Sequence, residues 1–321
     1  TAHQAASRQI GSHLIDDWNG NMGIGANLRS DAVGSAPFNG LIDEVGIYDR
    51  ALSSEVINLN DFSGETFVAF VVPPISNAPI LPDDFYITAK ILNELDITAA
   101  PGEYEPGSFV VHAFTALQSL ELETTNLAKV GGGDAIASAN VDVKTIGCRY
   151  QEGYLAGVWD HKRLIPELLL NNDSLVKVEN QQNYFKVDGQ YTLITPPATM
   201  VEFPIQDSST FQLVDIPQAT NKQFWVTVKV PDDAAPGSYE GTINLKISGQ
   251  VIGEIALNLE VPDITFSDDS FIRSIYYTSK LKTVDYIVPN YKNTTQFTAE
   301  LTDLFNHGVN NPTLYNQEDN S

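Results

Sequence analysis

The chain has 321 residues, enough for two or three domains of about 100–200 residues each. Its 41 acidic and 18 basic residues give a formal net charge of −23, which repels nucleic-acid phosphates and anionic membrane surfaces, so we expect neither as a partner. The single cysteine, Cys148, excludes an internal disulfide framework and is expected to be a small buried hydrophobe.

The first motif lies at residues 23–53. Within it, residues 41–48 alternate at a period of two, which is typical of a strand, and Ser53 is suited to cap a short helix. Residues 37–53, PFNGLIDEVGIYDRALS, resemble the closing segment of a laminin-G-like (concanavalin A-like) jelly roll. The resemblance covers residues 1–62 and implies the C-terminal part of a carbohydrate-binding domain.

Asp43 is the candidate metal ligand of this motif. Acidic residues of related jelly rolls sometimes bind calcium, so the resemblance implies a structural Ca²⁺ site at Asp43. Calcium takes six or more oxygen ligands, and the other donors would come from the part of the jelly roll that precedes residue 1. An ordinary surface role for Asp43 stays open.

Residues 71–82 contain four prolines, which remove backbone donors and favour an extended chain. We therefore predict a Pro-rich linker over residues 63–82. From residue 83 to about residue 266, short strands alternate with turn clusters, which is typical of an antiparallel β-sandwich.

The clearest strands of this sandwich are residues 223–230, 239–247 and 255–261, which we predict to form an antiparallel meander. One face is apolar and the other is polar. Trp225 lies on the face opposite Phe224 and is expected to make an interdomain contact. The motif AAPGEYE at residues 99–105 returns as AAPGSYE at 234–240, and each Pro-Gly is expected to form a turn before a strand.

The pattern changes again at residues 267–321. Residues 272–279 form a continuous apolar and aromatic run, which predicts a strand covered on both faces. Thr294 or Thr295 is predicted to cap a helix that ends at Gly308, and residues 310–315 form the next candidate strand. This order predicts the first βα unit of a truncated (β/α)₈ barrel.

Four segments resemble the N-terminal sandwich of bacterial proteins related to glycoside hydrolase family 123. They are residues 101–111, 166–176, 223–231 and 235–241. The resemblance spans residues 83–321 and implies a secreted, cell-surface or periplasmic bacterial enzyme that acts on N-acetyl-hexosaminides. It also implies that the catalytic Asp-Glu pair lies beyond Ser321, so no residue here is assigned as catalytic and the chain is expected to be inactive.

Five residues are candidates for carbohydrate binding. Trp159, Asp160 and His161 combine an aromatic platform with polar groups, a mixture suited to sugar rings. Tyr277 and Lys280 follow the first expected barrel strand, where barrel enzymes place substrate contacts. In each case the alternative is structural: Trp159 packing between domains, and Tyr277 and Lys280 filling the barrel or its rim.

The sequence therefore predicts a mainly β protein, with an antiparallel sandwich between a partial jelly roll and the start of a barrel. The leading hypothesis is the non-catalytic portion of a glycoside hydrolase. The alternative is a glycan-binding or adhesion protein built of β-sandwich modules, without a catalytic barrel.

Overall fold

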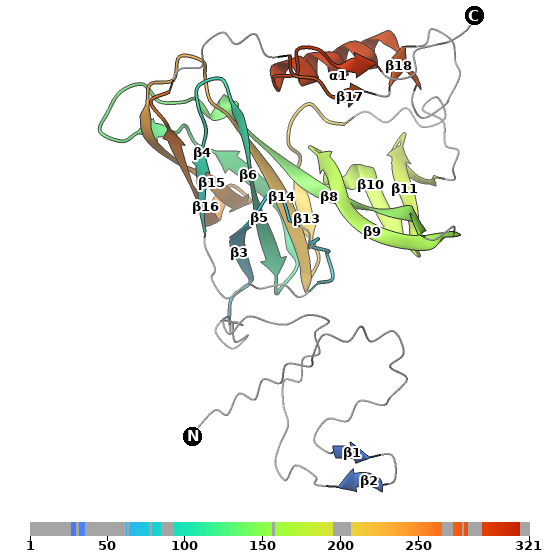
Figure 1. The fold of residues 1–321 in the computed structure, drawn as a ribbon. Helices are drawn as coiled ribbons and strands as arrows, with labels where there is room; N and C mark the ends of the chain where they lie inside the picture. Colours follow the sequence, from blue (N-terminus) through green and yellow to red (C-terminus); the bar gives the residue numbers. More distant parts are fainter. Residues whose placement is uncertain are drawn as a thin grey trace, which may run out of the picture. The chain divides into compact units, whose positions relative to one another are not determined.

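The computed structural model describes residues 27–29, 32–35, 62, 64–76, 79–84, 93–155, 158–194, 207–264, 272–277, 279–281 and 291–314. The chain divides into two compact units, Thr1–Ser53 and Ser54–Ser321 (Figure 1). In the first unit, β1 (Asn27–Arg29) pairs with β2 (Ala32–Ser35) in an antiparallel hairpin. Residues 37–53, with Asp43, lie outside the described residues, so the jelly roll and its calcium site stay predictions.

The second unit is built on a sandwich of two sheets (Figure 1). The six-stranded sheet consists of β4 (Glu94–Thr98), β6 (Leu117–Thr124), β7 (Ala128–Lys129), β13 (Val214–Ile216), β15 (Gly237–Ile247) and β16 (Gln250–Val261). The five-stranded sheet consists of β3 (Phe67–Val72), β5 (Tyr104–Ala113), β8 (Val141–Leu155), β9 (Val158–Leu170) and β14 (Thr220–Lys229). All pairs within them are antiparallel except β16 with β4. The predicted mainly β, antiparallel fold is confirmed.

The core lies between these two sheets and follows the period-two pattern of their strands. Ile243 and Leu257 are fully buried on the six-stranded sheet, and Phe224 and Phe109 stack at 4.9 Å between ring centroids on the five-stranded sheet. Alternate residues such as Asn244 face away from the core. The predicted apolar and polar faces of residues 242–247 and 255–261 are confirmed, because only one register buries every apolar side chain.

The predicted three-strand meander is wrong at its first strand. β15 and β16 form the expected hairpin, with Ser248 and Gly249 at φ values of 52° and 76° in its turn. However, β14 pairs with β5 and β8 in the other sheet. The turn at residues 231–236 therefore crosses from one sheet to the other, which strand periodicity alone does not distinguish from a hairpin.

The Pro-rich linker predicted over residues 63–82 is also corrected, because part of it forms a strand of the sandwich. β3 pairs with β5 over its whole length and buries Phe70 completely. Further along, the carbonyl of Leu81 accepts from Asn221 Nδ2 at 3.1 Å and the carbonyl of Pro82 accepts from Asn221 N at 2.8 Å. Its prolines follow β3 rather than interrupt it, so the segment is part of the sandwich.

The first copy of the repeated Pro-Gly motif forms a turn, as predicted, whereas in the second copy Pro236 is a bend and Gly237 already begins β15. Gly102 has a φ of 84° and Gly237 one of 134°, backbone conformations that favour glycine. Tyr239 is 2% exposed and donates its hydroxyl to the carbonyl of Ala235 at 2.6 Å, which ties the strand to the turn before it. The backbone N–H of Gly102 donates to Val230 at 3.0 Å, so the first turn lies beside the end of β14.

The hairpin of β8 and β9 extends beyond the sandwich. Only Val141 to Thr145 of β8 pairs with β14, whereas the pairing with β9 continues to Leu155. A separate sheet of three short strands lies against this extension (Figure 1). Its strands are β10 (Val176–Glu179), β11 (Gln182–Val187) and β12 (Gln190–Leu193).

The C-terminal described residues, 272–314, form β17 (Tyr276–Tyr277), β18 (Lys280–Leu281), β19 (Tyr291–Lys292), α1 (Thr294–Asn306) and β20 (Thr313–Leu314). β17 pairs in parallel with β20, and α1 lies between these two strands in the sequence. The barrel itself stays a prediction.

Two details of this C-terminal prediction are corrected. Asn293, not Thr294 or Thr295, caps α1, because its side chain accepts from Gln296 N while Gln296 bonds back to Asn293 N. The expected strand at residues 272–279 is reduced to Tyr276–Tyr277, and Ile272 is 73% exposed rather than covered. The helix end at Gly308 is confirmed by its φ of 84°.

Candidate functional site

Three of the predicted carbohydrate-binding residues lie on the backbone of β9, near the far end of the β8–β9 hairpin. His161 is opposite Gly153 in the strand register, and Trp159 and Asp160 follow toward the tip. Their side chains lie outside the described residues. The next residue along β9, Lys162, lines a pocket, so the sequence-based site and this pocket are adjacent on one strand.

The pocket has a volume of about 440 Å³ and lies between the hairpin and the small three-stranded sheet. This size is within the range of about 300–1,000 Å³ that is typical of small-molecule sites. The residues that line it are Arg149, Tyr150, Gln151, Lys162, Val176, Gln181, Gln182, Asn183, Phe185, Leu193 and Ile194. None of them is among the five binding residues predicted from the sequence, although Lys162 directly follows His161. We refer to this site as the hairpin pocket.

At the wall of this pocket, the side chain of Asn183 connects the small sheet to the hairpin by hydrogen bonds. Its Oδ1 accepts from the backbone N–H of Tyr150 at 2.7 Å, and its Nδ2 donates to the Tyr150 carbonyl at 2.8 Å. The amide side chain thus pairs with the strand as a neighbouring strand would. Since both groups of Tyr150 are satisfied by one side chain, the wall is held in place.

Glu167 on β9 contacts two pocket side chains of β8, Arg149 and Gln151. It accepts a hydrogen bond from Arg149 Nε, and both of its oxygens accept from Gln151 Nε2 at 2.6 Å. All three residues are strand residues with fixed directions, so the Arg149 guanidinium is oriented by its neighbours. Charge-assisted contacts of this kind are the stronger hydrogen bonds.

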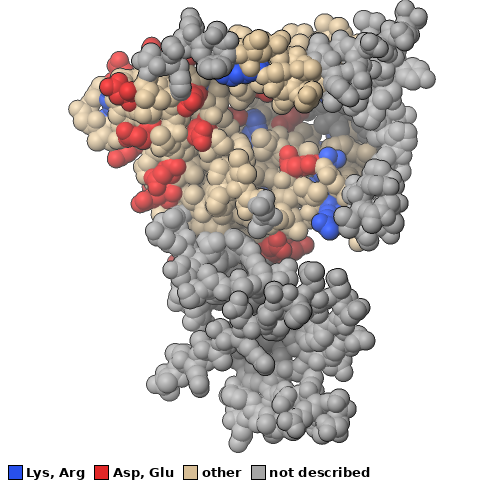
Figure 2. Space-filling view, in the orientation of Figure 1, with Lys and Arg blue, Asp and Glu red and all other residues tan. Residues whose placement is uncertain are grey.

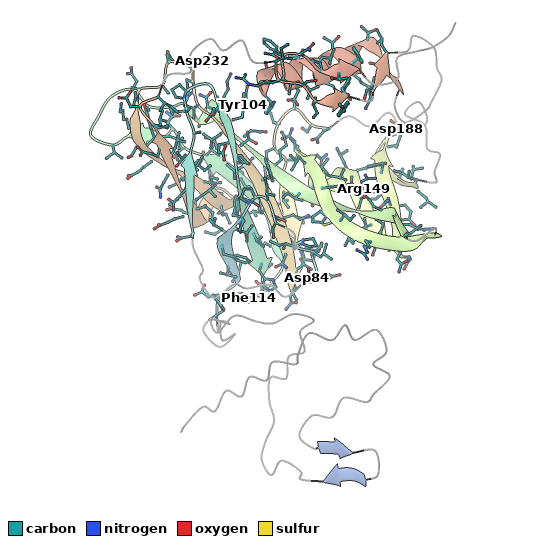
Figure 3. The ribbon with its side chains drawn as sticks, viewed as in Figure 1. Asp84, Tyr104, Phe114, Arg149, Asp188 and Asp232 are labelled. Carbon is teal, nitrogen blue, oxygen red and sulfur yellow. The ribbon has the colours of Figure 1, made fainter. Side chains whose placement is uncertain are left out.

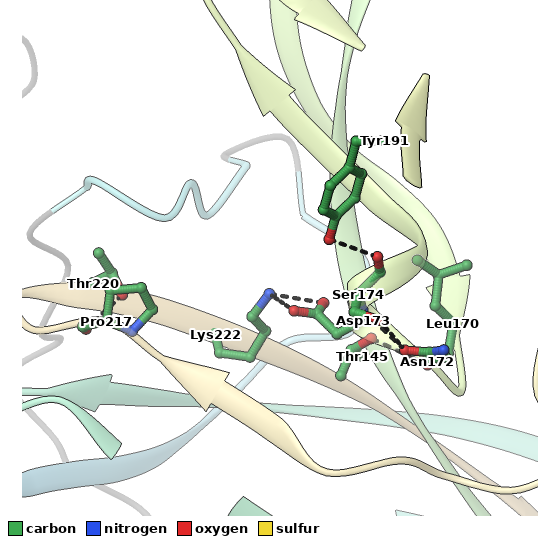
Figure 4. A network of polar contacts seen from close by, with 9 residues as sticks. All are labelled: Thr145, Leu170, Asn172, Asp173, Ser174, Tyr191, Pro217, Thr220 and Lys222. Atoms are coloured by element: carbon green, nitrogen blue, oxygen red, sulfur yellow. Dashed lines mark hydrogen bonds and ion pairs between the residues drawn. The ribbon is translucent and has the colours of Figure 1, made fainter. Parts of the chain in front are cut away.

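A second polar network anchors the base of the small sheet to the sandwich (Figure 4). Lys222 on β14 donates to both oxygens of Asp173 at 2.8 Å, and both side chains are largely buried. Asn172 Oδ1 accepts from Ser174 N at 3.1 Å, and the Tyr191 hydroxyl donates to the carbonyl of Ser174 at 2.8 Å. The turn η3 (Asp173–Leu175) thereby links β9, β12 and β14, which pre-forms the site.

Cys148 on β8 is half-buried near this network. Burial raises the pKa of its thiol from 9.0 to about 11, against the opposing effect of Lys222 and with the help of Asp173. A protonated thiol is a poor nucleophile and a poor metal ligand. The sequence predicts Cys148 to be a small buried hydrophobe. The structure agrees with this only in part, since the side chain is not fully buried.

Tyr277 is engaged within the C-terminal elements. Its hydroxyl donates to Glu300 of α1, and its ring lies 5.8 Å from that of Phe297. Lys292 also contacts Glu300, at 2.8 Å. Burial acts to raise the pKa of Glu300, but the hydrogen bonds from Lys292 and Tyr277 outweigh it and the pKa is lowered. The backbone of Lys280 lies in β18, and its side chain lies outside the described residues.

A second cavity, of about 510 Å³, is formed by residues 101–105 of the first Pro-Gly turn with Arg273 and residues 305–308. The Tyr104 ring lies 4.5 Å from that of His307, and Lys229 Nζ lies 5.4 Å from the Tyr104 centroid. Figure 3 places Tyr104 and Asp232 near these turns, apart from Arg149 in the hairpin pocket. The sequence-predicted sugar-binding residues thus divide between two places, β9 and the C-terminal elements.

Among the residues described, no three His, Cys, Asp or Glu side chains gather closely enough to hold a metal ion. Within the same part of the chain, no helix has the length and apolar character needed to cross a bilayer. Neither finding bears on Asp43.

Comparison with known families identifies one segment of the chain. Residues 168–247 match the glycoside hydrolase 123 N-terminal domain. The family 123 segment runs from the end of β9 to the end of β15 and includes the whole small sheet. Over this segment, which is less than half of the chain, the protein is related to glycoside hydrolases. None of the curated proteins matches it.

Three solved structures each resemble this chain weakly. A family 123 glycoside hydrolase from Clostridium perfringens, described for glycolipid glycan hydrolysis, aligns with 61% of this chain at 15% identity and a TM-score of 0.39. The alignment spans 27% of that protein's chain. AvmM, which catalyses macrocyclization in alchivemycin A biosynthesis, gives 7% identity, coverage of 64% and 94%, and a TM-score of 0.28. The E. coli adhesin CfaE gives 8% identity, coverage of 63% and 49%, and a TM-score of 0.23. Likeness at this level supports no functional argument.

Proposed function

We propose that this chain is the non-catalytic portion of a secreted bacterial glycoside hydrolase and that its sandwich binds glycan at the hairpin pocket. One observation carries the proposal: the family 123 segment, residues 168–247, supplies the whole small sheet that walls this pocket. The segment that relates the chain to glycoside hydrolases is therefore the segment that builds its concave site.

The lining chemistry supports a sugar ligand. Phe185, Leu193 and Val176 provide apolar surface for the C–H faces of a sugar ring, and Gln181 and Gln182 provide amides for its hydroxyls. Ligand sites commonly combine mostly apolar walls with a few polar groups that fix orientation. Trp159 lies on the backbone of β9 close to Lys162, and we propose it as a further aromatic contact for the same sugar.

The pocket is suited to binding rather than to hydrolysis. A glycosidase places two carboxyl groups on either side of the scissile bond, and the residues described as lining the pocket include neither Asp nor Glu. Adjacent pairs occur at Asp83–Asp84 and Asp232–Asp233, but both lie in turns outside it. We infer that the catalytic groups belong to a barrel of which residues 272–314 form the beginning.

The proposal retains two elements that rest on the sequence: an extracellular or periplasmic location, and Ca²⁺ at Asp43. The adhesion alternative shares the glycan-binding pocket and lacks the barrel. Both forms predict an isolated chain that binds without turnover, so binding is the property to test first.

The test is titration of the purified chain with N-acetylgalactosamine-containing oligosaccharides, followed by NMR, together with an assay on aryl N-acetyl-β-galactosaminides. We expect saturable shifts that are lost in Trp159→Ala, and no released product. Trp225→Ala is the matched control, because Trp225 lies on β14 outside the residues that line the pocket. Absence of binding, or turnover by this chain, would contradict the proposal.

A further inference from the structure

Charge does not single out a ligand for the hairpin pocket. In Figure 2, Asp and Glu gather over the six-stranded sheet, whereas both signs of charge appear on the side of the hairpin. Arg149 of the pocket is paired with Glu167. Lys162 lies opposite Glu152 in the register of β8 with β9. Both cations of the lining thus have an acidic neighbour, so we expect uncharged polar groups to select the ligand.

Four amide side chains line the pocket, and they differ in their partners. They are Gln151, Gln181, Gln182 and Asn183. Gln151 donates to Glu167, and Asn183 binds the strand backbone of β8. The Gln182 amide oxygen accepts from a tyrosine hydroxyl at 3.0 Å. Among the residues that the structure describes, none forms a hydrogen bond with the exposed amide of Gln181, so this group is available to a ligand.

Gln181 lies in a turn whose backbone favours glycine. Asn180 and Gln181 join β10 to β11 and have φ values of 50° and 58°. A type I′ hairpin loop needs positive φ at both of its positions, and Asn-Gly or Asp-Gly is its preferred sequence. Asparagine tolerates the left-handed region. A glutamine is strained there, because its Cβ comes too close to the following carbonyl oxygen.

Two other two-residue loops of the chain have the favoured sequence. Asp188 and Gly189 join β11 to β12 with φ values of 48° and 79°. Ser248 and Gly249 join β15 to β16 with φ values of 52° and 76°. Of these three loops, only the one that lines the pocket has glutamine in place of the glycine. Backbone strain of this kind is concentrated at ligand sites and other functional positions.

The amide of a glutamine is suited to a pair of neighbouring hydroxyls. Its oxygen accepts and its nitrogen donates, and the two atoms lie side by side in one plane. A sugar hydroxyl both donates and accepts, so two adjacent hydroxyls can bond to the two ends of one amide. Glycine at this position would relieve the strain of the turn, but it would remove the amide.

We propose that Gln181 is a specificity-determining residue of the hairpin pocket and that its amide binds two neighbouring hydroxyls of a neutral sugar ring. The turn keeps its strained backbone because the amide serves binding, whereas the apolar wall at Phe185 contacts the ring. This inference rests on the proposed glycan-binding function and adds the part of the ligand that is recognised.

Calorimetry of the full chain tests the contact with two probes. One is a trisaccharide that ends in N-acetylgalactosamine, and the other is its deoxy analogue, which lacks one of two neighbouring ring hydroxyls. We expect the wild type to bind the first about tenfold more tightly, a difference of the size that one hydrogen bond contributes. Gln181→Ala and Gln181→Gly should each lose this preference, because both remove the amide.

Thermal unfolding of the same variants, followed by circular dichroism, measures the strain. Gln181→Gly should raise Tm by about 2 °C, because relief of the strain outweighs the entropy that glycine adds to the unfolded chain. Gln181→Ala keeps a Cβ and should leave Tm unchanged. A purely structural role for Gln181 predicts instead that binding weakens only where Tm falls.

Gly249→Gln is the matched control. It places a glutamine at the equivalent loop position of the sandwich, where no described residue beyond the chain neighbours has a heavy atom within 4 Å of the added Cβ. It should lower Tm by about 2 °C. Both affinities should stay unchanged, because this loop lies outside the residues that line the pocket. Gly189→Gln repeats the control within the small sheet.

The outcomes separate the inference from the proposed function. Unchanged binding in Gln181→Ala, or equal binding of the two probes by the wild type, overturns the inference and leaves glycan binding standing. A lower Tm in Gln181→Gly also overturns it, since the turn would then carry no strain. So does a loss of preference in Gly249→Gln as large as in Gln181→Ala. Binding of neither probe to the wild type removes the glycan-binding function together with the inference.

Discussion

The sandwich and the C-terminal elements at residues 272–314 have apolar patterns of similar strength in the sequence, yet they differ in burial. Phe224 and Leu257 are fully buried, whereas Ile272 and Phe305 are 73% and 70% exposed. Every buried apolar side chain in the described residues lies between Val68 and Val261. A periodic pattern therefore predicts the local element, but burial requires a second element that covers it.

The two regions are also held by different forces. The sandwich is stabilised by apolar area removed from water, at about 25 cal/mol per Å². The contacts within the C-terminal elements are mainly polar. They are the capping box of Asn293 and Gln296 and the contacts of Glu300 with Tyr277 and Lys292. Exposed polar contacts contribute about 0–1 kcal/mol each, so this region should be the less stable.

Hydrogen exchange is expected to show the largest contrast between them. Amides of β15 and β16 should exchange only through global opening, whereas those of α1 should exchange through local opening. The free energy of local opening can be close to zero, whereas that of global unfolding is about 5–15 kcal/mol. We therefore expect the exchange rates of the two sets of amides to differ at least about a thousandfold. Mass-spectrometric exchange measures both in one sample. Equal protection would mean that residues 272–314 have a complete core, and the truncated-barrel hypothesis would fail.

The same substitution in both regions sharpens the comparison. Phe224→Ala removes a fully buried ring that stacks on Phe109 and should lower the free energy of unfolding by about 3–5 kcal/mol. Phe305→Ala removes an exposed ring and should change it by less than about 0.5 kcal/mol. Urea denaturation followed by tryptophan fluorescence measures each. A cost above about 2 kcal/mol for Phe305→Ala would show that α1 is covered in solution.

Much of the sandwich follows from the sequence because its information is local. The period-two strands at residues 239–247 and 255–261, the turn at Pro101 and Gly102 and the helix end at Gly308 are all specified by neighbouring residues. Strand partners are not. Whether β14 pairs with β15 or with β5 depends on the path of the turn at residues 231–236, and the sequence of β14 suits either sheet.

The hairpin pocket was less accessible to sequence reasoning, since its residues come from several separate segments between Arg149 and Ile194. Arg149 and Leu193 lie on different sheets and meet because Asn183 binds the backbone of Tyr150. The available signal was Asn183 within a strand, where an amide is otherwise unfavourable. A strand asparagine suggests a specific backbone partner, but it does not indicate which one.

A pH-dependent prediction distinguishes the two regions again, through Cys148 on β8. Burial raises the pKa of this thiol from 9.0 to about 11. The unfolded chain releases the proton near pH 9.0 and the folded chain near pH 11, so the contribution to stability is complete below pH 9.0. It is lost as the pH rises from 9.0 to 11, at about 1.4 kcal/mol per pKa unit.

Other groups titrate above pH 9, so the prediction concerns a difference between two proteins. We compare the free energy of unfolding of the wild type with that of Cys148→Ala. Between pH 8 and pH 11, the wild type should lose up to about 3 kcal/mol more of this free energy than the variant loses. Alkylation by iodoacetamide gives an independent measurement: at pH 8 the folded thiol should react about 100-fold more slowly than the unfolded one, because two pKa units remove most of the thiolate. Hydrogen exchange of α1 should not follow this titration, since Cys148 belongs to the five-stranded sheet. If α1 loosened together with β8, the two regions would unfold as one cooperative unit, and the contrast drawn from their burial would not extend to their stability.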